Sequence, residues 1–420
     1  MKKQILTFIT LVSAVMCFSL NTYANKPGAP KKFKRALIIA GGGIAPGVGL
    51  GLIAGAKKMG WNPDLIITTC GGSMSGAITN SIPHMDYALE YAKGPRFFDI
   101  LSQISIDTKS VFAMQKKFEQ ANDVIHIPQY FKGNVLALND EISGFLPLPY
   151  FARNLDAPKI IMLAAKANFG PQNVGQAFTD NRFTQVFFTD SQTANSIRNL
   201  KSPVKKLFPD SYLTENTLVV TDVSTEQAAR ASIADPYLIN PGKINGEYYF
   251  TGAVDLIPIE LATQLADEVI VTYPTGLFDD FENAAIQSTF GFNQTQRVLH
   301  AIQSKDVKWI DLSDASAIKF DPAASMTLTI SNNIPKIQSK FAEGIQEQYD
   351  LGFSRVQEAL TVQANHLNVR SHIRKPINPK LLKSFTCENA NEWKTIYNTS
   401  CTQDFWQGCN RNEPTCTPIR

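Results

Sequence analysis

The stretch Asp64–Ala77, with the sequence DLIITTCGGSMSGA, constrains the fold more than any other part of the chain. Its first half is a run of apolar and β-branched residues without alternation, which is typical of a strand covered on both faces. The run breaks at Gly71-Gly72 and continues as small residues that suit a helix start. A buried strand, a sharp glycine turn and a helix start together predict a nucleophile elbow, the turn that presents a reactive side chain in acyl hydrolases.

Two side chains of this turn, Cys70 and Ser73, are candidates for the nucleophile. A serine hydroxyl needs a neighbouring base, because its unassisted nucleophilicity near neutral pH is negligible. A cysteine thiol begins near a pKa of about 8.5, and a helix N-terminus can lower that value to roughly 3.5–7.5. Cys70 could therefore react without a carboxylate partner, whereas Ser73 could not, and the choice between them decides the mechanism.

The first 24 residues have the pattern of an export signal. Lys2 and Lys3 precede an apolar run from Ile5 to Leu20, and small residues follow up to Ala24. We expect cleavage after Ala24 and a periplasmic or secreted mature chain. The alternative is an uncleaved N-terminal anchor, but the run is shorter than the roughly 20 residues that a spanning helix needs.

Charge gives no indication of a nucleic-acid partner, since the net charge is +3 over 420 residues. A short basic run at residues 31–35 is either a solvated lead into the first strand or a contact for anionic lipid headgroups. The five histidines are scattered and do not pair with acidic residues at ligand spacing, so no metal is predicted.

Five cysteines remain after the predicted cleavage, and four of them lie in the tail. In an exported chain this even cluster predicts two disulfides with unknown pairing. The four are Cys387, Cys401, Cys409 and Cys416. Cys70 is then the odd cysteine, either a reactive thiol or a small buried apolar residue.

The N-terminal half of the chain begins as a strand, a glycine loop, a helix and a second strand. An apolar strand at 36–40 precedes Gly41-Gly42-Gly43, and a helix at 48–59 leads to the strand at 64. This order predicts a parallel sheet with helices on its faces. Residues 85–215 are interpreted as helices and loops. Further strands are expected at 217–223, 248–250 and 268–273, and a helix or turn at 228–234. Helices are expected at 259–266 and 345–367, the last amphipathic and packed on the sheet.

The glycine loop at 41–47, GGGIAPG, does not fit a nucleotide site. A P-loop requires a Gly-Lys-Ser/Thr ending, and a dinucleotide loop requires glycine where Pro46 stands. Consecutive backbone N–H groups of such a loop suit an oxyanion instead, which makes Gly41, Gly42, Gly43 and Gly71 the expected oxyanion-hole donors. The alternative is a tight turn without a chemical role.

The glycine loop, the helix after it and the DLI-containing elbow together resemble the patatin-like phospholipase family over roughly residues 35–275. Val220–Val223 and Pro258–Ala262 resemble two further family segments. The resemblance implies a three-layer α/β/α fold with a mostly parallel central sheet. It also implies hydrolysis of lipid acyl esters by a Ser–Asp dyad, without a cofactor, on a lipid or membrane-surface substrate.

The chain departs from the family pattern at the catalytic positions. Counted without gaps from Asp64, the serine position is occupied by Cys70; a three-residue insertion would give the position to Ser73. In the later Asp-Gly-Ala motif Thr251 stands at the Asp position, and Asp255 is a weaker substitute base. Ala45 and Pro46 replace the loop arginine and the glycine after it.

Three functions remain open from the sequence. The first is an exported patatin-like acyl hydrolase with altered catalytic residues, and the second is a patatin-fold protein that binds lipid or a protein partner without catalysis. The third is a thiol-dependent acyltransferase or redox-responsive protein that uses Cys70. The predicted organisation is a signal peptide at 1–24, a linker at 25–34, a patatin-like domain at 35–275, an extension at 276–370 and a small cysteine-rich tail at 376–420.

Overall fold

The computed structural model describes residues 31–41, 45–102, 105–106, 126–132, 134, 136–137, 144, 146–151, 157–177, 180–273, 280–312 and 337–361. Residues from Phe33 onward form one compact unit, and Met1–Lys32 form a second unit of which Lys31 and Lys32 are described. The predicted signal peptide and the predicted disulfide-rich tail lie outside the described residues.

A nine-stranded, mostly parallel sheet forms the centre of the larger unit. Seven strands follow the order β11-β10-β1-β2-β5-β6-β7, and the other two lie off this path, with β9 paired to β5 and β8 paired to β9. Neighbours from β11 to β5 are parallel, as are β6 and β7, whereas β5 pairs with β6 and β9 in the antiparallel sense. The strands are β1 Phe33–Ile39, β2 Leu65–Thr68, β5 Lys159–Ala167, β6 Phe183–Phe188, β7 Leu218–Val220, β8 Gly242–Ile244, β9 Glu247–Phe250, β10 Ala266–Tyr273 and β11 Lys308–Asp311, with a separate pair β3 Ser105–Ile106 and β4 Leu136–Ala137.

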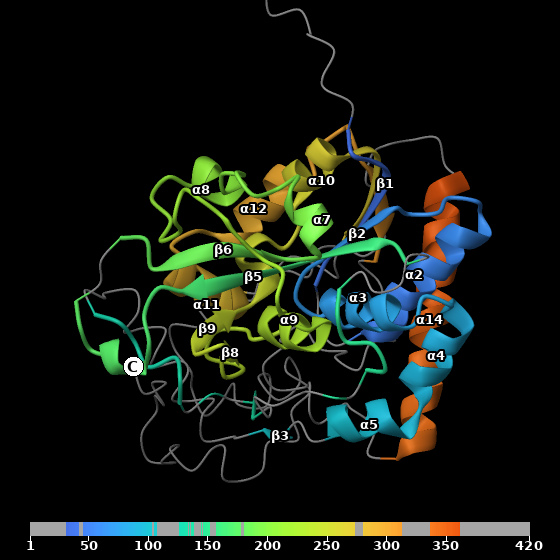
Figure 1. The fold of residues 1–420 in the computed structure, drawn as a ribbon, viewed down its shortest axis with the longest axis horizontal. Helices are drawn as coiled ribbons and strands as arrows, with labels where there is room; N and C mark the ends of the chain where they lie inside the picture. Colours follow the sequence, from blue (N-terminus) through green and yellow to red (C-terminus); the bar gives the residue numbers. More distant parts are fainter. Residues whose placement is uncertain are drawn as a thin grey trace, which may run out of the picture. The chain divides into compact units, whose positions relative to one another are not determined.

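Helices lie on both sides of the sheet, with α7, α10 and α12 on one side and α2, α3 and α9 on the other (Figure 1). This arrangement is compatible with a three-layer α/β/α fold. The helices are α2 Pro46–Lys58, α3 Gly72–Ser81, α4 Met85–Lys93, α5 Pro95–Ser102, α7 Ser191–Ala194, α8 Pro203–Leu207, α9 Thr225–Ser232, α10 Ile259–Leu265, α11 Asp280–Phe290, α12 Gln294–Ala301 and α14 Gln338–Thr361, with 3₁₀ turns η1 Pro171–Asn173 and η2 Gly252–Asp255.

Most predicted elements are found, and two predictions for the sheet are wrong. Residues 85–215 were expected to hold helices and loops, but they contribute the sheet strands β5 and β6, which lie between β2 and the edge strand β7. The strand β5 has the sequence KIIMLAAKA, whose Lys, Leu, Met and Ala residues are good helix formers, so its burial in the sheet overrides local preference. The strand expected at 217–223 is shorter and only half-buried, because β7 lies at the edge of the sheet.

The predicted C-terminal amphipathic helix is present as α14, and it packs chiefly on α2 instead of on the sheet. Three glycines on one face of α2 permit this contact, namely Gly47, Gly51 and Gly55, and Gly352 lies opposite them on α14. A Cβ on Gly51 would collide with the backbone of Tyr349 and Phe353, and a Cβ on Gly352 would collide with the Val48 carbonyl. The two helix backbones therefore approach more closely than side chains would allow, and α2 lies between α14 and the strands that carry the site.

Candidate functional site

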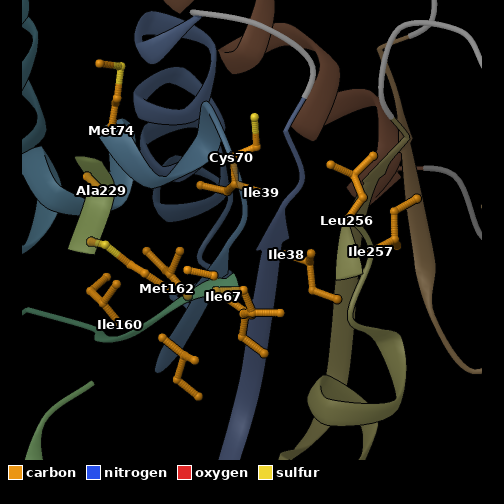
Figure 2. Close-up of a cluster of buried hydrophobic side chains, with 14 of the residues drawn as sticks. Ile38, Ile39, Ile67, Cys70, Met74, Ile160, Met162, Ala229, Leu256 and Ile257 are labelled. Carbon is orange, nitrogen blue, oxygen red and sulfur yellow. The ribbon is translucent and has the colours of Figure 1, made fainter. Parts of the chain in front are cut away.

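Cys70 occupies the tip of the turn between β2 and α3. Its backbone has φ +47°, an uncommon conformation for a residue with a Cβ. Hydrogen bonds fix the turn: the Ser73 amide donates to the Cys70 carbonyl at 2.9 Å, and the Gly72 amide donates to the Thr69 carbonyl at 3.0 Å. The side chain is only 5 % exposed and belongs to the buried apolar cluster that also contains Ile39 (Figure 2). A strained, over-determined turn of this kind is typical of functional sites.

The sheet brings the end of β9 to the end of β2. Both strands pair with the same edge of β5, but β2 runs parallel to it up to Thr68 and β9 runs antiparallel to it down to Phe250. Their carboxyl ends therefore point toward each other, and the residues that follow them meet. A Cβ on Gly252 would lie 2.6 Å from the Cys70 nitrogen, so a glycine is required where the two segments touch.

Asp235 is the carboxylate beside the thiol, and it is not among the site residues predicted from the sequence. It follows α9 in a fully buried irregular segment, and the Cys70 Sγ donates a hydrogen bond to its Oδ2 at 3.8 Å. The Thr251 hydroxyl contacts both the Cys70 thiol and the Asp235 carboxyl. The sequence signal for Asp235 is a single acid within an apolar run, Ile233–Ile239, because buried carboxylates are rare without a partner.

Burial controls the protonation of both groups. It raises the pKa of the Cys70 thiol well above its ordinary value, and the Asp235 charge raises that pKa further, while the Gly71 amide and the Thr251 hydroxyl oppose the shift. Burial also raises the pKa of Asp235 to about 6, against the hydrogen bonds from Thr251 and Cys70. The sequence predicts that the helix start lowers the thiol pKa of Cys70. This prediction is wrong, because desolvation outweighs the helix dipole. Near pH 7 the pair is a neutral thiol beside a carboxylate.

Ser73 lies in the first turn of α3, one turn beyond the elbow tip, and is fully buried. Its hydroxyl donates to the Ser232 Oγ at 2.9 Å and shares a second hydrogen bond with the Thr68 Oγ1 at 3.1 Å. These partners are hydroxyl groups and not bases. The geometry therefore gives Ser73 no activating group within the described residues.

Asp255, the other candidate base, has different partners. Its Oδ1 accepts from the Arg297 Nε at 3.1 Å and from the Arg297 Nη2 at 2.9 Å, and its Oδ2 accepts from the Gln185 side chain at 3.3 Å. Arg297 also donates to the Ile257 carbonyl and to the Glu260 carboxylate. Both oxygens of Asp255 are thus engaged, Oδ1 in an ion pair that ties η2 to α12 and Oδ2 in a hydrogen bond with Gln185, so we assign it a structural role instead of that of a base.

The expected oxyanion donors differ in their availability. The Gly71 amide is directed at the Cys70 thiol. The Gly41 amide instead donates to the Thr69 Oγ1 at 3.0 Å, so the expectation for Gly41 is not met in this arrangement. Gly41 remains close to the site, since a Cβ on it would lie 2.5 Å from the Cys70 Cβ. Gly42 and Gly43 lie outside the described residues.

A small apolar cavity lies between α3, α5 and α9, with Met74, Phe97 and Ala229 among its lining residues. Met74 is one turn beyond Cys70 on α3, and Ile233 of the same lining is two residues before Asp235. Within the described ranges, no cluster of three His, Cys, Asp or Glu side chains is placed to hold a metal ion. No helix among the described residues has the length and apolarity to cross a membrane.

Comparison with known proteins leaves the family unassigned. No known family profile and no curated protein matches the sequence. Among solved structures, the chain is similar to VipD from Legionella pneumophila, with 15 % identity and a TM-score of 0.31 over 79 % of this chain and 68 % of that chain. A likeness of this size does not support an argument about activity, so the functional assignment depends on the site itself.

Proposed function

We propose that the chain is an acyl ester hydrolase in which Cys70 is the nucleophile and Asp235 is the general base. The observation that carries the proposal is the buried thiol that donates to a carboxylate at the tip of a strained strand-to-helix turn. A nucleophile with a base within hydrogen-bond reach is the minimal unit of covalent acyl transfer. In patatin-like proteins the catalytic carboxylate stands at the position that Thr251 occupies in this chain. We propose that Asp235 supplies this carboxylate instead.

Cys70 and Asp235 together can carry out both steps of ester hydrolysis. The Cys70 sulfur attacks the ester carbonyl carbon and its proton moves to Asp235, while the carbonyl oxygen becomes an oxyanion beside the Gly71 amide. The intermediate collapses, Asp235 returns the proton to the leaving alcohol, and an acyl thioester remains on Cys70. Asp235 then takes a proton from water as the water oxygen attacks the thioester. The second intermediate collapses, Asp235 returns that proton to the Cys70 sulfur, and the carboxylic acid is released.

The substrate class follows from the resemblance and from the apolar surroundings of the thiol. The sequence motifs resemble those of patatin-like lipid hydrolases, and Cys70 lies among buried apolar side chains such as Ile39 and Met74. We therefore propose lipid esters as substrates and the patatin-like family as the origin of the fold. Export to the periplasm or the medium and two tail disulfides remain part of this proposal.

A second candidate function is a binding protein that has lost catalysis. It is favoured by the engaged Gly41 amide and by burial, which keeps the Cys70 thiol protonated. In that case Cys70 and Asp235 would be a structural contact, and the site would bind a lipid or a protein without turnover.

The pH dependence of hydrolysis separates the two candidates. Asp235 must be ionised to accept the thiol proton, and its pKa is about 6. The rate of hydrolysis should therefore rise tenfold per pH unit below about pH 6 and level off above it. Replacing Asp235 by Asn should remove this acid limb and lower the plateau by about 100-fold, the usual contribution of a general base.

The measurement is kcat/KM for nitrophenyl esters between pH 4.5 and 8.5, with Asp267→Asn as the matched control. Asp267 is an exposed carboxylate at the start of β10, so its replacement should leave the profile unchanged. An acid limb near pH 6 that survives in Asp235→Asn would assign the base to another group. The absence of hydrolysis at every pH would favour the binding protein.

A further inference from the structure

The residues Asp235–Leu238 form a buried turn with an unusual residue at its third position. The Leu238 amide donates to the Asp235 carbonyl at 3.1 Å, Pro236 is the second residue and Tyr237 has φ +66°. In a β-turn whose third residue has a positive φ, that residue is normally Gly or Asn. A bulky side chain in that conformation is strained and persists only when its surroundings hold it.

The Tyr237 side chain is held by aromatic rings. It is fully buried, and its ring centroid lies 5.0 Å from that of Tyr130. Tyr130 packs in turn on Phe169, Phe183 and Phe250 at 5.5–6.3 Å. We refer to Tyr130, Phe169, Phe183, Tyr237 and Phe250 as the aromatic cluster.

The aromatic cluster reaches both segments that contact the thiol. Tyr237 lies two residues after Asp235, and Phe250 directly precedes Thr251. The two segments are also joined by a hydrogen bond from the Thr251 amide to the Ala234 carbonyl at 3.0 Å. Because the ring contacts fix Tyr237 and Phe250 relative to each other, they also fix the separation of the Asp235 carboxyl and the Thr251 hydroxyl.

We propose that Tyr237 is a positioning residue, whose buried ring anchors the turn in the aromatic cluster and thereby holds the Asp235 carboxylate against Cys70. The proposal rests on the function proposed above for its effect on catalysis, but its structural part does not require turnover. The titratable group that faces Asp235 is Cys70, and the Thr251 hydroxyl is its other polar contact. Without the ring the turn loses its anchor, Asp235 can move away from the sulfur, and the carboxylate charge then no longer opposes ionisation of the thiol.

The test compares Tyr237→Gly, Tyr237→Asn and Tyr237→Phe with the natural chain. Glycine and asparagine accept the positive φ but lack the ring, whereas phenylalanine keeps the ring. One readout is the rate of Cys70 alkylation by iodoacetamide between pH 6 and 10, which needs no catalysis. The other is kcat and KM for nitrophenyl ester hydrolysis, with folding checked by circular dichroism.

We expect Tyr237→Gly and Tyr237→Asn to alkylate at least threefold faster at pH 8 and to lose at least tenfold in kcat with KM within threefold. Tyr237→Phe should recover most of the lost kcat. The control is Phe292→Ala, which removes a buried ring that packs on Phe208 and Phe290 and should keep the natural alkylation profile.

Natural alkylation rates and natural kcat in both the folded Gly and Asn variants would overturn the proposal. If one of the two fails to fold, the other decides. Full hydrolysis by Asp235→Asn would instead contradict the proposed function, and the alkylation comparison would still report whether Tyr237 holds the carboxylate in place.

Discussion

Replacing Cys70 by alanine is expected to lower ester hydrolysis by about 10⁴-fold or more, because removal of the nucleophile from a catalytic unit commonly costs that much. The replacement deletes one buried sulfur and keeps a Cβ in the same φ +47° turn, so the fold should persist. Ser73 cannot take over the role, since its hydroxyl partners are Ser232 and Thr68. The measurement is fatty-acid release from phospholipid and nitrophenyl esters by the purified variant.

Ser73→Ala is the matched control for this loss. It removes a buried hydroxyl one turn away on the same helix, and it should retain hydrolysis if Cys70 is the nucleophile. Unchanged hydrolysis by Cys70→Ala together with loss in Ser73→Ala would transfer the role to Ser73. Cys70→Ser should keep a fraction of the activity, because Asp235 provides the base that the sequence alone did not show beside this position.

Replacing Arg297 by methionine is expected to destabilise the fold by about 3–5 kcal/mol, the usual cost of breaking a buried ion pair from one side. The Arg297 side chain is 1 % exposed and that of Asp255 is 0 % exposed, so the carboxylate would be left without its cation in the core. The same arginine binds the Ile257 carbonyl and Glu260, which means that the end of η2 would lose its anchor. Urea denaturation followed by circular dichroism measures the loss.

Lys201→Met is the control, since Lys201 and Glu215 form an exposed ion pair at 3.3 Å. Surface pairs contribute little, so this variant should unfold near the natural midpoint. The double variant Arg297→Met/Asp255→Leu should recover part of the loss, because it removes the uncompensated charge. A loss in Arg297→Met no larger than that of Lys201→Met would contradict a buried, structurally coupled pair.

Local patterns predicted the parts of the fold whose neighbours are close in sequence. The strand and helix at the start, the elbow and α14 all follow from periodicity and from glycine placement. The strands β5 and β6 did not, because the residues of β5 favour a helix and its strand conformation depends on pairing with β2 and β6. Their place in the sheet depends on pairing with strands that are distant in the sequence.

The sequence predicts one member of the proposed catalytic pair and not the other. The glycine turn identified Cys70, but Asp235 lies 165 residues away and follows a helix whose end carries no motif. Burial then reversed the expected direction of the thiol pKa, since a helix start is visible in a sequence whereas desolvation depends on the packed fold. Asp255, which was visible beside the Thr-Gly-Ala segment, is bound by Arg297 from α12.

The acyl thioester on Cys70 is the most direct test of the proposed mechanism. The natural chain is mixed with nitrophenyl butyrate, whose good leaving group favours formation of the thioester over its hydrolysis, and is quenched in acid within seconds. Peptide mass spectrometry should then find the added butyryl group on the peptide that contains Cys70 and not in Cys70→Ala. A butyryl group on Ser73, or hydrolysis without any adduct on Cys70, would contradict the account.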